Sequence, residues 1–121
     1  MKNKHLHVAR RKMSHVIDEI YTALLRTGGN EVQLRIVREP EGLRLLAVGD
    51  FAAENRHHVE RMAELLQPAV RTPALVEEFW ELAGGDQYTS DSELALVGQM
   101  LDGAVVNLAG RTVRMNLYIA F

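Results

Sequence analysis

An aspartate stands where an apolar run gives way to a loop in the stretch "LRLLAVGDFAAENRHH", residues 43–58. The run predicts a strand over residues 43–48, which stops at Gly49 and Asp50. Many α/β proteins present a ligand-binding group in the loop that follows a strand. An aspartate after a glycine is also common where an ordinary turn closes. This stretch alone therefore leaves both a working and a structural Asp50 open.

Five histidines are the other side chains that could bind a metal ion. His5 and His7 would share one face if residues 4–9 form a strand, and His57 and His58 lie at the start of a predicted helix. Zinc needs three or four converging ligands, usually at a recognisable spacing. The sequence contains no cysteine and no HxxxH or HExxH pattern. We therefore expect no metal site, and histidines that are solvated or that cap helices.

Composition limits the classes of protein to consider. The chain has 121 residues, 47% hydrophobic and 25% charged, which is average for a soluble domain. A net charge of −2 gives no long-range field for nucleic acid or an anionic membrane. No signal peptide and no run of about eighteen apolar residues is visible, so we expect no membrane contact. The lack of cysteine is compatible with the cytoplasm, where we place the protein.

Helical and strand patterns follow one another along the chain. We predict a helix capped by Ser14 and ended by Gly28 and Gly29, and residues 1–13 as an N-terminal extension or an edge strand. Residues 14–121 form one predicted domain. Its other predicted elements are strands 31–39 and 43–48, helices 59–66, 72–82 and 94–101, and strands 104–109 and 112–121. This order predicts an α+β fold: a two-layer sandwich of a mixed, mostly antiparallel sheet with helices on one face.

The order of motifs over residues 14–121 resembles the histidine-kinase-like ATPase (GHKL) domain. "DEIYTALLRTGGN" stands where that family has a helix reading like "SELLTNALRHGGG". "AVGDFAAEN" stands where the family has a strand ending in V-x-D-x-G-x-G. "DSELALVGQML" then replaces a helix reading like "GLGLALVRQL", and a closing hairpin follows. The resemblance implies the two-layer fold and a cleft for ATP with magnesium.

The residues that would bind the nucleotide differ from the family. The family's magnesium-binding Asn corresponds to Ala23, which has no ligand atom. Glu19 matches the family's acidic position and Asp50 its adenine-binding Asp. The glycines that let adenine lie against the backbone correspond to Ala52 and Glu54.

The helix start that corresponds to the family's phosphate site differs even more from the family pattern. Family glycines offer bare backbone amides to phosphate at a helix N-terminus, and here Asp91 and Glu93 occupy their positions. Each carboxylate would repel a phosphate charge by roughly 4 kcal/mol at 4 Å with an effective dielectric constant of 20. "SDSE" is also a capping box, in which Ser90 caps the helix and Glu93 reaches back to the cap amide. We expect that helix end to be satisfied by its own side chains.

Other candidates have simpler interpretations. Kinases of this family phosphorylate a histidine on a separate helical hairpin, for which this chain has no room, so we expect His15 to be a surface or partly buried helical residue. Phe79 and Trp80 have the helical spacing of core residues, although neighbouring positions cannot both point inward, and an exposed aromatic would mark a partner surface. The basic run "ARRKM" is too short to predict nucleic-acid binding.

We therefore predict a regulatory or protein-interaction module without ATPase activity or cofactor, which binds a protein partner or a second copy. Asp50 is then the relic of an adenine contact. The alternative is a divergent ATPase or an anti-sigma-type protein kinase that binds ATP with magnesium. In that case Asp50 would contact adenine, and Glu19 would act as the catalytic base or order a metal-bound water. A third possibility is that the resemblance is accidental, which would leave a small α/β domain of unknown role.

Overall fold

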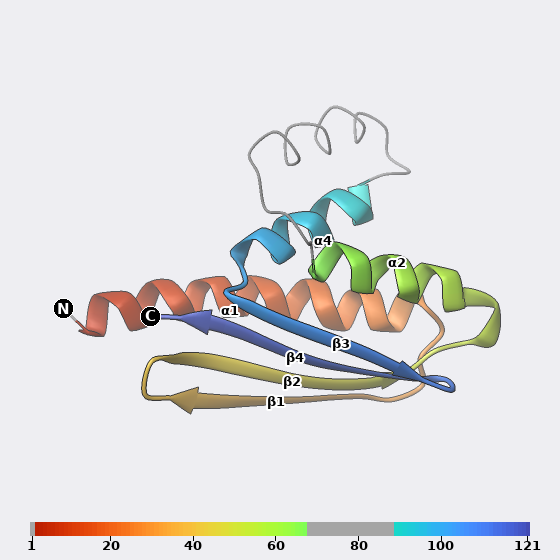
Figure 1. Cartoon of the computed structure of the whole chain (residues 1–121), viewed down its shortest axis with the longest axis horizontal. Coiled ribbons are helices and arrows are strands. Elements are labelled where there is room, and N and C mark those ends of the chain that lie inside the picture. Colours follow the sequence, from red (N-terminus) through yellow and green to blue (C-terminus); the bar gives the residue numbers. More distant parts are fainter. Residues whose placement is uncertain (1, 68–88) are drawn as a thin grey trace.

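The computed structural model describes the backbone of residues 2–67 and 89–121, and side chains from His5 to Gln67 and from Asp91 onward (Figure 1). The predicted helix 72–82, with Phe79 and Trp80, lies outside the described residues. So does the side chain of Ser90. The elements are α1 (Lys2–Arg26), β1 (Val32–Glu39), β2 (Gly42–Asp50), the short 3-10 helix η1 (Ala53–Asn55), α2 (Arg56–Leu66), α4 (Thr89–Met100), β3 (Gly103–Ala109) and β4 (Thr112–Ala120).

The four strands form one open sheet in the order β1-β2-β4-β3. Each described pair is antiparallel, so the sheet is simpler than the predicted mixed one. Two hairpins build it, β1 with β2 and β3 with β4, and the pairing of β2 with β4 joins them. The α-helices of the described residues, α1, α2 and α4, lie on one side of the sheet (Figure 1), where α1 packs on β2 and β4 and α2 packs on β3. The predicted two-layer α+β sandwich is confirmed.

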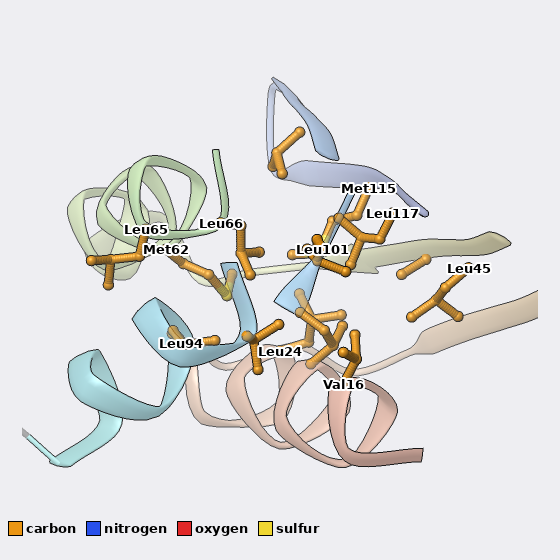
Figure 2. Packing of buried hydrophobic residues seen from close by; sticks show 14 of the residues in the cluster. Val16, Leu24, Leu45, Met62, Leu65, Leu66, Leu94, Leu101, Met115 and Leu117 are labelled. Atoms are coloured by element: carbon orange, nitrogen blue, oxygen red, sulfur yellow. The ribbon is translucent and has the colours of Figure 1, made fainter. Parts of the chain in front are cut away.

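The core lies between the helices and the inner face of the sheet. Alternate residues of the two central strands point toward the helices, for example Leu45 of β2 and its register partner Leu117 of β4, which are both fully buried. From α1, Val16, Ile20 and Leu24 meet them with the spacing of one helical face. Figure 2 shows side chains from α1, α2, α4 and the sheet in this single cluster.

For the N-terminal residues, one of the two predicted alternatives and the predicted helix cap are wrong. Residues 2–13 belong to α1, so the edge-strand alternative is wrong, and Ser14 lies inside the helix instead of capping it. The Ser14 hydroxyl donates to the carbonyl of Arg10, 3.1 Å away. No glycine or proline interrupts residues 2–26, and buried Ala9 and Met13 continue the apolar face of the helix toward its start. The alternating "HLHV" resembles a strand only when it is considered apart from the helical spacing of the apolar residues that follow it.

Close packing of α4 against α2 depends on one glycine. A Cβ atom at Gly98 would overlap the carbonyl oxygen of Leu65 and would lie 3.4 Å from the Cα atom of Leu66. Val97, the residue beside Gly98, is fully buried. The missing side chain thus lets the two helix backbones touch, which places the first turn of α4 opposite α1 and the start of α2.

Candidate functional site

A cleft of about 640 Å³ lies between α1, the start of α2 and the first turn of α4. Its volume is in the range of pockets that bind small molecules, about 300–1,000 Å³. The cleft is lined mainly by polar and charged side chains, with Ala23, Met62 and Leu94 as its apolar members. The elements on which sequence reasoning placed Glu19, Ala23 and Asp91 therefore do come together around one hollow.

The wall formed by α1 presents one acid and one position without a ligand atom. Glu19 and Ala23 lie one helical turn apart and both line the cleft. Ala23 contributes only a methyl group. The pKa of Glu19 is raised, first by partial burial of its carboxyl group and then by the neighbouring charge of Glu93, while His15 and Arg26 partly offset these effects. Glu19 is thus more easily protonated than an ordinary glutamate.

The wall formed by α4 carries acids that face basic groups of the same chain. Asp91 Oδ2 lies 3.7 Å from Arg61 Nε, so this ion pair joins α4 to α2 at the cleft. Glu93 Oε2 lies 3.8 Å from His15 Nε2 on α1, whose side chain is 43% exposed, as expected for a surface histidine. The helix begins at Thr89, one residue before the predicted cap Ser90. The capping box itself stays a prediction, because the Ser90 side chain is not described.

Asp50 lies outside the lining of this cleft and binds the loop between α1 and β1. Its Oδ1 accepts hydrogen bonds from the backbone amides of Asn30 at 2.9 Å and Glu31 at 3.0 Å, and Oδ2 accepts one from the Asn30 side chain at 3.3 Å. The hydrogen bond from the Glu31 amide is the main reason why the pKa of Asp50 is lowered. In this structure Asp50 therefore stabilises the loop between α1 and β1.

Glycines let that loop approach the end of β2. A Cβ atom at Gly29 would lie 2.6 Å from the backbone oxygen of Asp50, and Gly28 has a φ of +87°, which other residues rarely adopt. The carbonyl of Thr27 then accepts hydrogen bonds from the Ala52 amide at 3.0 Å and the Asn55 side chain at 3.1 Å. The turn that carries Ala52 and Glu54 is thus tied to the end of α1.

Sequence reasoning missed several residues of the cleft. Asn55, Arg26 and Arg61 line it. Arg26 and Asn55 lie in stretches that carry the family resemblance, but at positions to which no role was assigned, and Arg61 lies outside those stretches. His57 and His58, considered only as metal ligands, also line it, with ring centroids 3.9 Å apart. Their position just after a strand and a short turn was the one available signal, because such loops commonly border ligand sites.

Comparison of the chain with protein-family models, with curated proteins and with solved structures gives no match. Membership of the histidine-kinase-like ATPase family therefore stays a proposal. Among the described residues, no helix combines the length and apolar character needed to cross a membrane.

Proposed function

We propose that this chain is a non-catalytic regulatory module with a histidine-kinase-like ATPase fold, which acts by binding a protein partner or a second copy. The observation that carries the proposal is the lining of the cleft. It has the size and location expected of a nucleotide site, but its walls offer carboxylates and a methyl group where magnesium and phosphates would bind.

The metal position supports the absence of catalysis. Magnesium requires oxygen ligands in a near-octahedral shell. Ala23, at the position of the family's magnesium ligand, has no oxygen in its side chain. Glu19 lies one turn away in the same wall, but a single carboxylate without that partner would hold Mg²⁺ weakly.

The phosphate position argues in the same direction. Asp91 lines the cleft and Glu93 lies on the same helical turn, so two carboxylates occupy the helix end that would approach a triphosphate. Arg61 could attract phosphate, but its Nε atom already faces Asp91 at 3.7 Å. A polyanion would have to compete with that internal ion pair and approach the second acid.

Exposed apolar side chains support protein contacts as the mode of action. Tyr21 and Leu25 lie one turn apart on α1 and are 41% and 52% exposed. Ile36 on the edge strand β1, which borders α1, is 52% exposed. Exposed apolar groups near an open sheet edge are typical of surfaces that bind another protein.

The alternative function, a divergent ATPase or anti-sigma-type kinase, is favoured by the cleft volume and by Glu19, which faces the cleft with a raised pKa as a general base would. Asp50 fits that alternative less well, because backbone and side-chain donors of Asn30 and Glu31 already occupy its carboxylate. An adenine contact through Asp50 would require that loop to move.

Thermal melts with millimolar Mg-ATP and Mg-ADP separate the two functions. A ligand at a hundredfold excess over its Kd stabilises the folded state by about 2.7 kcal/mol, which would raise the Tm of a domain of this size by several degrees. We expect no shift. A clear shift in the wild-type chain that is lost in Glu19→Gln would contradict the proposal, and Glu60→Gln on the exposed face of α2 is the matched control.

A further inference from the structure

Three side chains of types that can ligate a metal ion converge between α1 and α4, beside the cleft. His15 and Glu19 lie one turn apart on α1, and Glu93 lies in the first turns of α4. One ligand atom from each residue, an imidazole nitrogen or a carboxylate oxygen, lies within 4.8 Å of the other two. We propose that His15, Glu19 and Glu93 bind one transition-metal dication such as Zn²⁺, which links α4 to α1.

The geometry is close to what zinc requires. Zinc binds imidazole nitrogen and carboxylate oxygen at about 2.0–2.2 Å, so tetrahedral ligand atoms lie about 3.3 Å apart. The present spacing of up to 4.8 Å is wider. The side chains of His15 and Glu93 are 43% and 36% exposed, so small rotations can bring their ligand atoms together without disturbing the core.

The backbone that carries the three ligands is held firmly. Val16 and Ile20, which follow His15 and Glu19 directly in sequence, are fully buried, and Leu94 next to Glu93 is 7% exposed. Each ligand therefore follows or precedes a residue that anchors its helix in the core. Ligands on helices that are anchored in this way hold a metal site more accurately than ligands on loops.

The donor set selects the class of metal. Magnesium and calcium prefer six or more oxygen ligands, whereas imidazole nitrogen favours zinc and other first-row transition metals. One nitrogen and two carboxylates supply three protein ligands, which leaves a coordination position for water. We therefore expect Zn²⁺ and Co²⁺ to bind and Mg²⁺ not to compete.

Charge in the cluster also favours a cation. The ligand oxygens of Glu19 and Glu93 lie within 4.8 Å of one another, so two carboxylates face the same position. His15 adds a nitrogen ligand atom beside them, with its Nε2 atom 3.8 Å from Glu93 Oε2. A dication would neutralise both carboxylates at once.

The linear sequence conceals this site. His15 and Glu19 form an H-x-x-x-E pair, which is common on helices without a metal, and the third ligand comes from the far end of the chain. Only the packing of α4 near α1 brings Glu93 to the pair. The expectation of no metal site rested on the missing linear pattern, so this proposal revises it.

Isothermal titration of the whole chain, after dialysis against a chelator, tests the site with ZnCl₂ and separately with MgCl₂. We expect one Zn²⁺ per chain, and at least about a tenfold weaker affinity in each of His15→Gln, Glu19→Gln and Glu93→Gln. His5→Gln, on the exposed side of the same helix, and Glu60→Gln on α2 are matched controls that should keep the wild-type affinity.

A second readout checks that the metal lies between the helices. Co²⁺ should give visible absorption bands typical of a nitrogen- and oxygen-ligated site in the wild-type chain and in both controls, and these bands should disappear in the three ligand variants. Circular dichroism confirms that each variant remains folded. Equal zinc affinity in ligand and control variants, equal affinity for Mg²⁺, or no zinc binding by the wild-type chain would overturn the proposal.

Discussion

Two acidic regions of this molecule differ in how their carboxylates are satisfied. Asp50 accepts two backbone hydrogen bonds and one side-chain hydrogen bond, which lower its pKa. The pKa of Glu19 is raised, first by partial burial of its carboxyl group and then by the charge of Glu93, the acid that faces it. A carboxylate that accepts several N–H hydrogen bonds stabilises the local structure. Carboxylates that face one another favour the binding of a proton or a cation, which reduces their repulsion. The carboxylate group thus has opposite physical roles in two regions of one fold.

We expect the largest loss of stability from a substitution in the core that supports both regions. Leu24 is fully buried on α1, and its δ-carbons lie 3.4 Å from where a Cβ of Gly49 would be. Replacing Leu24 with alanine should lower the free energy of unfolding by about 2–5 kcal/mol, because the surrounding core cannot fill the cavity. Chemical denaturation measures the change. The adjacent variant Leu25→Ala is the control, since Leu25 is 52% exposed and should lose far less.

A smaller loss should follow when the packing of α4 is disturbed. In Gly98→Ala the new Cβ overlaps the Leu65 carbonyl oxygen, so the helices must separate, and we expect about 1–3 kcal/mol of destabilisation. This change should also weaken zinc binding, because it moves Glu93 away from α1. Gly103→Ala is the control, because its Cβ would make only an ordinary contact at 3.5 Å with Tyr118. Equal melting temperatures for the two variants would show that α4 does not depend on close contact at Gly98.

We expect the smallest effects on stability from Asp50 and Glu19, whose contributions change with pH in opposite directions. The lowered pKa of Asp50 means that its contribution to stability is present above its ordinary value of 3.8 and is lost as pH falls through the folded-state value. The raised pKa of Glu19 means the reverse: stability falls as pH rises from its ordinary value of 4.5 through the folded-state value.

Thermal melts of Asp50→Ala and Glu19→Gln across these pH values measure the difference. Relative to the wild-type chain, Asp50→Ala should become less stable as pH rises, and Glu19→Gln should become more stable. Glu54→Ala, an exposed acid in the turn after β2, should track the wild-type chain. The comparison fails if both acids shift stability in the same direction.

Local patterns were sufficient to predict much of this fold. The alternation of apolar residues in Val32–Glu39 and Thr112–Ala120 identified both hairpins, because one face of β4 is buried and Val32 and Leu34 of β1 pack partly against the core. The start of α1 was missed because "HLHV" alternates over too short a window. The pairing of β2 with β4 is a contact between distant segments, which no local pattern encodes.

The site was predictable only in part, for a related reason. Glu19, Ala23 and Asp91 were placed by their order along the chain, and they do line one cleft. The partners of Asp50 could not be predicted, because the Asn30 and Glu31 amides reach it only through the close approach that Gly29 permits. The convergence of Glu93 on His15 likewise depends on helix packing, which the residue types alone do not specify.

The central claim is that the cleft binds no magnesium nucleotide, and an NMR titration of the amide-labelled chain tests it most directly. Mg-ATP is added up to millimolar concentration while the backbone amides of cleft residues such as Ala23, Arg61 and Asp91 are followed. We predict that these signals stay in place. Saturable shifts confined to cleft residues, and absent in Glu19→Gln, would contradict the account and show a working nucleotide site.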